Sequence, residues 1–516
     1  MSKVAVAVAV AVVVVTAAVA AVAVVAAAAR ALAESRVTVT RGVARLATSR
    51  YPLEASRSIL ASTVREGTKK TAEAPLVNAE QSHVSGKLKK LLQPYSPGGL
   101  FSSARLHYSG PEVSPAIILS GPQLGNLAAV WPNSEWYGNH IVQRASGSGL
   151  TAEEAMLPGL VEGLERYSTG VCRDTQFIFA SAAELGTESL NLDDVPRCSD
   201  RELAHPKCPL ILPDKQKPIR YVQGLSLFDG RTVYVPAVMA YSYVVNIQPD
   251  ERFWLPTSTG CGGHSSYEDA LLSGIYEVIE RDAISITWLQ KLSLPRIEVD
   301  VWPPLLAPLW ETFLSGSSNV QTSFFNATFD LGVPTIYAVQ RSLVNQHAAT
   351  LLACSSSHSI VNALAKTIRD LAMMNAAFRQ TRPVPGSWDD FSEPTHGAIY
   401  MAHHDRRHAF DFLLNSSSTA KLSVLMGSES HDHSLQRILN MLREKELPAF
   451  AVDLSTDEAV RSGIRIVRVI IPGLQPLSFR YRARFLGHPR LYELPRKMGF
   501  PVLTEDELND FPQPFA

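Results

Sequence analysis

An internal duplication constrains this chain more than any other feature of its sequence. Residues 153–167 read EEAMLPGLVEGLERY, and residues 268–282 read EDALLSGIYEVIERD. The two segments share an acid at the start, an apolar pair, a glycine and a closing Glu-x-x-Glu-Arg. Each follows a glycine-rich stretch, at 147–149 and at 260–263. The chain is therefore expected to build the same local structure twice.

Both segments are predicted to be helices that begin at a glycine-rich turn. A hydroxyl residue stands three positions before an acid in each copy, Thr151 before Glu154 and Ser266 before Asp269. In a capping box, the hydroxyl and the acid satisfy amides left free at a helix start. Apolar residues at helical spacing mark the buried face of each helix. They are Leu157, Leu160, Val161 and Leu164 in the first helix and Leu271, Leu272, Ile275 and Ile279 in the second.

Charged side chains gather on another face of each predicted helix, because residues three and four apart share a face. These groups are Glu162, Glu165 and Arg166 in the first helix and Glu277, Glu280 and Arg281 in the second. Carboxylate oxygens suit magnesium, and an arginine can grip a phosphate with two N–H groups. The alternative for either helix alone is a solvated face with intrahelical ion pairs. The repetition favours two acidic faces that converge on one charged ligand.

Composition narrows the class of protein. At 516 residues the chain can hold two or three domains or one large one, and 46% hydrophobic with 19% charged residues is ordinary for a globular protein. A net charge of −1 argues against a nucleic-acid partner. The five cysteines are scattered and form no CxxC pair, which indicates neither a structural zinc site nor a disulfide framework. These features favour a reducing, cytoplasmic setting.

The amino-terminal region is expected to stand apart from the fold. Residues 4–29 are Ala and Val with one Thr, long enough to span a bilayer and also compatible with a secretory signal. Alanine is only weakly apolar and the flanks carry little orienting charge. We therefore expect residues 1–36 to be a low-complexity extension, although this run leaves membrane association open. Residues 37–92 are expected to be a polar region or linker.

Residues 93–516 are expected to form the main domain, with helices and strands mixed along the chain. Strands are predicted at 115–120, 127–130, 231–244 with a break at Pro236, 320–341, 448–453 and 464–471. A helix is predicted at 363–379, and the proline-spaced tail at 512–516 is expected to be extended. The spacing of Cys198, His205 and Cys208 matches no standard zinc pattern, so a surface loop is favoured there.

A histidine-rich stretch, with His403, His404 and His408 near Asp405 and Asp411, is interpreted as an exposed helix start rather than a metal site. No Walker A loop, GxGxxG, HExxH or GxSxG motif is present in usable form. If the chain binds a nucleotide, it must do so with another architecture.

The matched helices, the sequence STGCGG at 258–263 and the proline-spaced end make this chain resemble the YcaO family. It is most similar to the azoline-forming cyclodehydratases, the D component of thiazole/oxazole-modified peptide pathways. The resemblance covers roughly residues 93–516 and includes stretches at 451–456, 463–477 and 487–499. It implies an α/β (α+β) fold, a YcaO-like ATP-binding domain with mixed sheets. Acids and arginines, not a phosphate loop, would hold ATP and Mg²⁺.

The resemblance also implies a reaction and its partners. A Cys, Ser or Thr side chain of a ribosomal precursor peptide attacks the preceding backbone carbonyl, and ATP phosphorylates the resulting oxyanion. Loss of phosphate leaves a thiazoline or oxazoline, which solves the problem that an amide oxygen is a very poor leaving group. Implied partners are the precursor peptide, a separate leader-peptide-binding protein and a flavin-dependent azoline dehydrogenase. Homodimers are common among relatives.

The family's motifs assign site residues in this sequence. The cofactor-binding set is Ser148, Glu162, Glu165, Arg166, Asp269, Ser273, Glu277 and Arg281. The metal-binding set is Glu162, Glu165, Asp269, Glu277 and Glu280. The tail residues expected to be catalytic are Pro514 and Ala516.

Several neutral motif positions depart from the family pattern, at Ser148, Pro158, Gly262, Ser273 and Ala516. Pro158 removes a helical hydrogen bond and costs about 3 kcal/mol unless the helix kinks, which would shift Glu162 relative to Glu277. These departures support an alternative, a non-catalytic scaffold with the same fold. The retained acids favour an enzyme, because clustered carboxylates repel unless a cation neutralises them. Backbone thioamidation is the rival chemistry on this fold.

Overall fold

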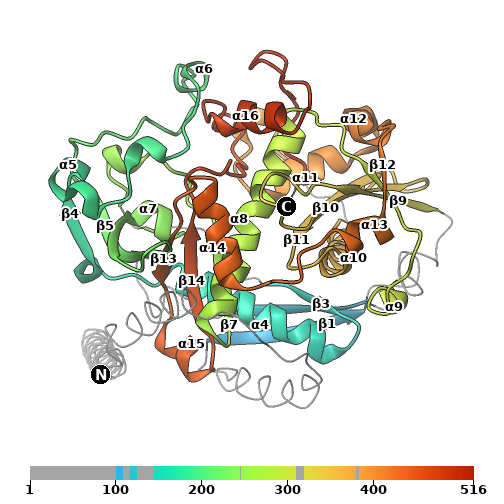
Figure 1. Cartoon of the computed structure of the whole chain (residues 1–516), viewed down its shortest axis with the longest axis horizontal. Coiled ribbons are helices and arrows are strands. Elements are labelled where there is room, and N and C mark those ends of the chain that lie inside the picture. Colours follow the sequence, from blue (N-terminus) through green and yellow to red (C-terminus); the bar gives the residue numbers. More distant parts are fainter. Residues whose placement is uncertain are drawn as a thin grey trace, which may run out of the picture. The chain divides into compact units, whose positions relative to one another are not determined.

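The computed structural model describes residues 100–108, 117–124, 145–244, 246–309, 319–378 and 383–515 (Figure 1). The chain divides into two units, residues 1–57 and 58–516, and all described residues belong to the second. The expectations for residues 1–36 and 37–92, including the apolar run, and for the strand at 127–130 therefore lie outside the described residues. Within the described ranges, no helix has the length and apolarity needed to cross a membrane.

Three sheets organise the described residues. The first has the order β1 (Phe101–Tyr108), β2 (Ile118–Leu124), β3 (Gly147–Gly149). The second has the order β4 (Phe177–Ala180), β5 (Ile219–Ser226), β13 (Phe450–Asp453), β14 (Arg465–Ile470), β7 (Cys261–His264), with β6 (Thr232–Pro236) also paired to β5. The third has the order β11 (Thr350–Ser356), β10 (Thr335–Ser342), β9 (Val320–Asn326), β8 (Arg296–Glu298), β12 (Thr419–Lys421). The β8–β12 pair is parallel and the other pairs are antiparallel.

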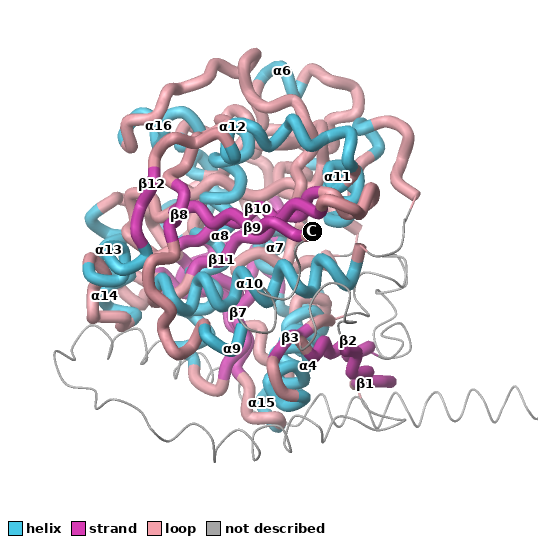
Figure 2. The backbone as a smooth tube through the Cα atoms, turned by 90° about the vertical axis from the view of Figure 1, so that its right-hand side faces the viewer, coloured by secondary structure: helices cyan, strands magenta, loops and turns pink. Residues whose placement is uncertain are grey.

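The third sheet lies between two helices, α8 (Tyr267–Leu289) and α10 (Ile360–Ala377). Side chains alternate across a strand, so β10 can serve both helices. Tyr337 and Val339 pack in the same cluster as Ile284 of α8, whereas Ile336 packs with Leu364 of α10. Figure 2 shows α10 running alongside these strands. Burial on both faces explains why β10 is apolar along most of its length.

Helix α8 also covers the second sheet, where β14 separates it from the first repeated helix, α4 (Ala152–Ser168). Val469 of β14 packs with Ile275 of α8, whereas Ile466 packs with Leu160 of α4. Helix α8 is therefore buried between two sheets, which accounts for its nearly continuous apolar character after residue 282. Figure 1 shows this long helix through the middle of the described elements.

The remaining helices are shorter. They are α5 (Ala182–Leu185), α6 (Asp200–Leu203), α7 (Ala237–Ala240), α9 (Ala307–Leu309), α11 (Pro394–Ala402), α12 (Asp411–Leu414), α13 (Leu422–Gly427), α14 (Leu435–Glu444), α15 (Asp457–Arg461) and α16 (Arg490–Lys497). Helix α14 lies against α8 in Figure 1, and its Ile438 packs in the same cluster as Ile275.

The structure agrees with the strands predicted near 320–341, 448–453 and 464–471 and with the helix at 363–379. The prediction of strands over 231–244 was wrong in its second half. Strand β6 ends at Pro236, and residues 237–240 form the buried helical turn α7. Proline fixes its own φ, here −53°, and begins the turn, so a β-rich composition alone misassigned the segment. The stretch after His403 is a 3₁₀ helix from His404 to Phe410, with His403 at its start.

A buried ion cluster ties the end of α8 to α16. The guanidinium of Arg490 donates two hydrogen bonds of 2.8 Å to Asp282 and further bonds of 2.8 and 3.2 Å to Asp330. The Asp282 carboxylate also accepts from the backbone N–H of Gln475 at 2.8 Å. One guanidinium thus holds two carboxylates, and loss of Arg490 would leave both without a counter-charge. It fixes the carboxyl-terminal half of α8 from the side opposite the glycine turn.

Candidate functional site

The two glycine turns are built alike. A Cβ atom on Gly147 would lie 2.2 Å from the carbonyl oxygen of Ala155 and 2.6 Å from the nitrogen of Gly159. A Cβ atom on Gly262 would lie 2.0 Å from the carbonyl oxygen of Ala270 and 2.8 Å from the nitrogen of Gly274. The contacted residues occupy matching positions in the two repeats. Glycine is therefore required in both strands, since any side chain would push the strand away from its helix.

The helix starts show the predicted hydroxyl caps. Thr151 Oγ1 accepts from the backbone N–H of Glu154 at 3.2 Å, and Ser266 Oγ accepts from that of Asp269 at 3.1 Å. The acids do not complete the expected capping box. Glu154 instead accepts from the N–H of Leu150 at 2.9 Å, and Asp269 accepts from the Ser266 hydroxyl at 2.6 Å. Helix α4 continues without interruption through Pro158, whose side chain is exposed.

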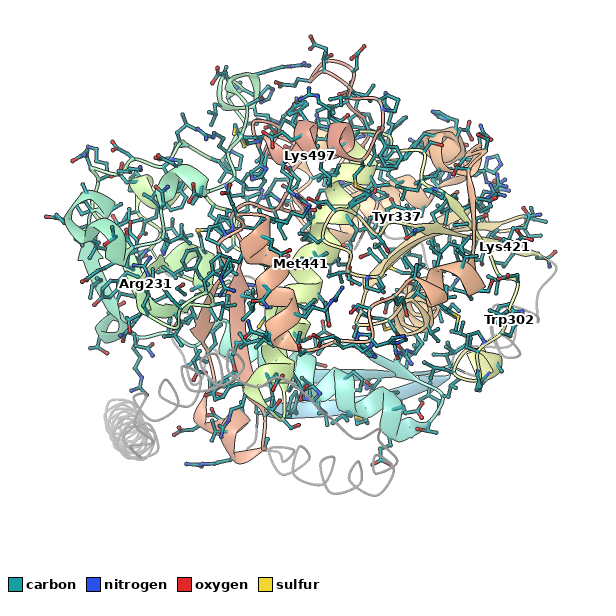
Figure 3. All side chains as sticks on the ribbon, viewed as in Figure 1. Arg231, Trp302, Tyr337, Lys421, Met441 and Lys497 are labelled. Carbon is teal, nitrogen blue, oxygen red and sulfur yellow. The ribbon has the colours of Figure 1, made fainter. Side chains whose placement is uncertain are left out.

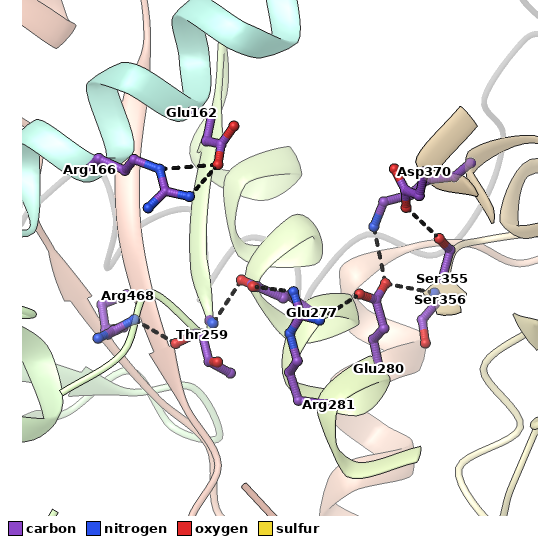
Figure 4. A network of polar contacts seen from close by, with 12 residues as sticks. Glu162, Arg166, Thr259, Glu277, Glu280, Arg281, Ser355, Ser356, Asp370 and Arg468 are labelled. Atoms are coloured by element: carbon purple, nitrogen blue, oxygen red, sulfur yellow. Dashed lines mark hydrogen bonds and ion pairs between the residues drawn. The ribbon is translucent and has the colours of Figure 1, made fainter. Parts of the chain in front are cut away.

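Helix α4 presents a carboxylate held by an arginine. Glu162 Oε1 accepts from Arg166 Nη2 at 2.6 Å and from its Nε at 3.1 Å (Figure 4). Glu162 Oε2 accepts from the backbone N–H of Ser146 at 2.6 Å and from its hydroxyl at 3.1 Å. Both members of the ion pair keep more than a quarter of their side-chain surface accessible, 28% for Glu162 and 29% for Arg166. A ligand can therefore reach both charges.

Helix α8 repeats this pairing. Arg281 Nη2 lies 3.3 Å from Glu277 Oε1, and Glu277 Oε2 accepts from the backbone N–H of Gly260 at 2.9 Å. Gly260 has φ of 82°, a conformation that favours glycine, and its N–H points back to the helix. Arg281 also lies 3.5 Å from Glu280 Oε1 and so bridges the two acids of its own helix. In each repeated helix, the first glutamate of the Glu-x-x-Glu-Arg motif, Glu162 or Glu277, is thus held by the arginine of that motif and by a backbone N–H at the preceding glycine turn.

The two sets converge at β7. Glu165 of α4 lies against the glycine turn that precedes α8, because a Cβ atom on Gly263 would be 2.8 Å from Glu165 Oε1. Burial, followed by the negative charges of Glu277 and Glu162, raises the pKa of the Glu165 carboxyl well above its ordinary value. The Glu277 carboxylate meets the same turn, because its Oε2 accepts from the backbone N–H of Gly260 at 2.9 Å. Glu165 and Glu277, from the two repeated helices, therefore both contact the glycine segment at 260–263.

A further polar group continues from α8 to β11 and α10 (Figure 4). The Glu280 side chain is only 4% exposed, and its carboxylate accepts at 3.0 Å from both the backbone N–H of Ser356 and Nζ of Lys366. Asp370, one turn beyond Lys366 on α10, accepts from the Ser355 hydroxyl at 3.1 Å. Sequence reasoning missed these partners of Glu280. Lys366 and Asp370 at i and i+4 on an otherwise mainly apolar helix were the available signal.

A buried arginine supports the second glycine turn. Arg468 of β14 is 1% exposed, and its guanidinium donates to the carbonyl oxygens of Met239 at 3.2 Å, Thr259 at 2.5 Å and Thr257. These bonds hold the segment that leads into Gly260. A small cavity of about 40 Å³, lined mainly by apolar side chains and by Arg281 and Arg468, lies beside it. Sequence reasoning treated Arg468 only as part of a strand.

Three predicted site residues are not part of this network of polar contacts. Asp269 is bonded to Ser266 at the start of α8 and lies 3.1 Å from His264 Nδ1. It precedes Glu277 by about two helical turns, roughly 12 Å along the helix axis, and its predicted metal-binding role stays a prediction. Ser273 is exposed on α8, and Ser148 lies in β3 opposite Leu119. Cofactor-binding roles for these residues remain predictions.

The carboxyl-terminal tail packs beside the third sheet. Pro514 is buried, and the Phe515 ring meets the Tyr337 ring edge-on at 5.2 Å between centroids. Tyr337 lies opposite Cys354 in the β10–β11 pair, and burial followed by the charge of Glu280 raises the pKa of the Cys354 thiol. Tyr337 and Cys354 therefore connect the tail with the surroundings of Glu280. Ala516 lies outside the described residues, and the catalytic roles predicted for Pro514 and Ala516 remain predictions.

Across the described ranges, no three His, Cys, Asp or Glu side chains are grouped so as to hold a metal ion. That the loop at 198–208 and the stretch after His403 bind no metal stays a prediction. Near α4 and α8, the carboxylates engage arginine or lysine. Their donor set still suits magnesium, because all donors are carboxylate oxygens and Glu165 and Glu277 contact the same glycine turn. Repulsion between neighbouring carboxylates is relieved when a cation binds.

The chain is similar to one known protein family and to proteins of other organisms. A family model described as YcaO cyclodehydratase, ATP- and Mg²⁺-binding, matches residues 146–475. An uncharacterized protein of Methanothermobacter thermautotrophicus is 25% identical over 381 residues, 68% of this chain and 86% of that protein. An uncharacterized protein encoded in the tfuA 3′ region of Rhizobium leguminosarum bv. trifolii is 23% identical over 257 residues, 47% of this chain and 56% of that protein.

Solved structures share the fold. A heterocyclase in complex with substrate and cofactor has a TM-score of 0.69 at 20% identity, covering 86% of this chain and 59% of that one. The heterocyclase TruD has a TM-score of 0.56 at 21% identity, covering 70% and 50%. YcaO from Methanopyrus kandleri, bound with AMPPCP and Mg²⁺, has a TM-score of 0.55 at 15% identity, covering 77% and 91%. The predicted mixed α/β fold is confirmed, and this chain spans only part of the two heterocyclases.

Proposed function

The chain belongs to the YcaO family, a family of ATP- and Mg²⁺-binding proteins, and on that premise we propose that it is an ATP-dependent, magnesium-requiring peptide heterocyclase. Its substrate would be a ribosomal precursor peptide, in which Cys, Ser or Thr residues are closed to thiazoline or oxazoline rings. A separate leader-peptide-binding protein would present the peptide. A flavin-dependent azoline dehydrogenase would act on the product.

The observation that carries this proposal is that Glu165 of α4 and Glu277 of α8 contact the same glycine turn, the first at Gly263 and the second at Gly260. Two neighbouring carboxylates that are partly shielded from water repel each other unless a cation neutralises their charge. Sequence duplication alone does not require this geometry, because two such helices can present their acids to solvent on opposite faces. Facing acids support a site for a divalent cation together with a polyanion.

We assign roles to the chain's own residues on this basis. Glu162, Glu165 and Glu277 would hold magnesium, which would supply positive charge to a transferring phosphoryl group. Arg166 and Arg281 each already donate to a carboxylate and retain 29% and 21% accessible side-chain surface. Their planar guanidinium groups would grip phosphate oxygens in two-point contacts. The Gly260 turn, fixed by Arg468, would keep Glu277 in place.

The chemistry requires activation of an amide oxygen. A Cys thiol or a Ser or Thr hydroxyl would add to the preceding carbonyl carbon, and the oxyanion would accept the γ-phosphoryl group of ATP. Expulsion of phosphate would then form the ring C=N bond. The arginines would stabilise negative charge as it spreads over the phosphoryl oxygens.

Mass spectrometry of a Cys-, Ser- and Thr-containing precursor incubated with ATP, Mg²⁺ and the leader-binding partner tests the proposal. A loss of about 18 Da per modified residue is expected for cyclodehydration, whereas a gain of about 16 Da indicates backbone thioamidation. An unmodified peptide in the presence of demonstrated ATP binding would favour the non-catalytic scaffold. A Glu162→Gln/Glu277→Gln variant is the matched control and should leave the peptide unmodified.

A further inference from the structure

The second glutamate of the Glu-x-x-Glu-Arg motif has different charged neighbours in the two repeats. The duplicated sequence does not predict this difference. Glu165 and Glu280 occupy matching positions. Glu165 faces the negative charges of Glu162 and Glu277, and the Arg166 guanidinium donates through both Nε and Nη2 to Glu162. Glu280 is bonded by Lys366 and by the backbone N–H of Ser356. One position is left with excess negative charge and the other is neutralised.

The number of charged side chains that each repeat supplies leads to the same contrast between Glu165 and Glu280. Each repeated helix supplies two carboxylates and one guanidinium to the site, which leaves one negative charge in excess per repeat. The ammonium of Lys366 offsets that excess beside Glu280. Asp370 adds a further carboxylate on the same helix, where it accepts from the Ser355 hydroxyl at 3.1 Å. Among the described residues, the lysine contact at 3.0 Å belongs to the second repeat alone.

The exposure of this pair shows which member faces outward. The Glu280 side chain is 4% exposed, whereas 46% of the Lys366 side chain is accessible. The carboxylate is therefore the buried anchor of the pair, and the lysine side chain is its more accessible member. Ser356 holds the anchor from the end of β11, and Asp370 lies one turn further along α10. A lysine fixed in this way presents a point charge to an anion with little loss of side-chain entropy.

We propose that Lys366 is a built-in cation that takes the place of a metal ion beside Glu280 and presents its ammonium to the polyphosphate of the bound nucleotide. This inference rests on the proposed function. It confines metal binding to Glu162, Glu165 and Glu277 and makes Glu280 a positioning residue for Lys366. The chain accordingly binds no metal ion through Glu280.

Titration with Mn²⁺ and a non-hydrolysable ATP analogue tests this assignment, with bound Mn²⁺ counted by electron paramagnetic resonance and nucleotide affinity measured by calorimetry. The variant Glu280→Gln should bind the wild-type number of Mn²⁺ ions per chain. Lys366→Met should weaken nucleotide binding by roughly tenfold, and Lys366→Arg should recover most of the loss. Lys497→Met removes a surface lysine paired to Glu493 on α16 (Figure 3) and should change neither quantity.

Loss of one Mn²⁺ ion in Glu280→Gln would overturn the assignment, and so would wild-type nucleotide affinity in Lys366→Met. Since Lys366→Met leaves Glu280 without its lysine, the double variant Lys366→Met/Glu280→Gln provides a neutral pair. It should fold, keep the wild-type Mn²⁺ number and show the same loss of nucleotide affinity. If the wild-type protein bound neither nucleotide nor Mn²⁺, the proposed function would fail and this inference with it. Loss of Mn²⁺ in Glu280→Gln alone would refute only the role of Lys366.

Discussion

Glu165 on α4 and Glu277 on α8 contact the same glycine turn: a Cβ atom on Gly263 would lie 2.8 Å from Glu165 Oε1, and Glu277 Oε2 accepts from the N–H of Gly260 at 2.9 Å. The two residues are 112 positions apart and come from different copies of one repeated segment. Their approach depends on β7, whose Gly263 lies against Glu165 and whose chain leads directly into α8. The position of α4 is thereby tied to the glycine turn that precedes α8.

Close packing at the repeated glycines predicts a specific destabilisation. Gly147→Ala and Gly262→Ala place a methyl group within 2.2 and 2.0 Å of a helix carbonyl oxygen, so each should lower the free energy of unfolding by about 1–3 kcal/mol or more. Gly121→Ala is the matched control, because nothing lies within 4 Å of its added Cβ. Chemical denaturation of the three variants provides the measurement. Equal stability of Gly262→Ala and Gly121→Ala would contradict the described packing of β7 on α8.

The ion cluster around Arg490 predicts a large asymmetry between buried and surface pairs. Arg490→Met leaves Asp282 and Asp330 without their guanidinium and should lower the free energy of unfolding by about 3–5 kcal/mol. Arg201→Met removes a surface arginine paired to the well-exposed Asp506 and should have little effect. Urea titration distinguishes the two. A similar small effect in both variants would show that Arg490 does not secure α8 to α16.

His488 predicts a loss of stability in mild acid. It is 5% exposed, its Nε2 lies 3.2 Å from the carbonyl oxygen of Pro472, and burial lowers its pKa from 6.5 to about 4. Between these values the unfolded chain binds more protons than the folded chain, so the free energy of unfolding rises with pH and falls as pH drops from 6.5 to 4. The contribution reaches about 3 kcal/mol at the acid end. His488→Gln should reduce this slope, and an unchanged slope would rule out the effect.

Local patterns predicted the parts of the site that the chain encodes locally. Helical spacing, hydroxyl caps and adjacent glycines all lie within one repeat, and the structure shows both helices with the Glu162–Arg166 and Glu277–Arg281 pairs on them. The partners of Glu280 could not be found in this way. Lys366 comes from α10 and reaches Glu280 at the end of the edge strand β11, where the N–H of Ser356 bonds to the same carboxylate oxygen.

Two further differences have the same origin. Arg468 looked like an ordinary residue of a strand, and its three carbonyl partners come from Met239 and from the segment at 257–259, more than 200 residues away. Asp269 matched a family position, yet its helix turn gives it a bond to Ser266 instead of a place beside Glu277. Sequence spacing fixes which residues share a helix face, whereas tertiary packing decides which faces meet.

Calorimetric titration with ATP and Mg²⁺ tests the central claim most directly. The wild-type protein should bind the nucleotide in a Mg²⁺-dependent manner, and Glu162→Gln/Glu277→Gln should lose at least roughly tenfold in affinity while retaining its fold by circular dichroism. Glu493→Gln on α16 should bind as the wild type does. A folded wild-type protein that binds no ATP, or a Glu162→Gln/Glu277→Gln variant with undiminished affinity, would contradict a nucleotide site between α4 and α8.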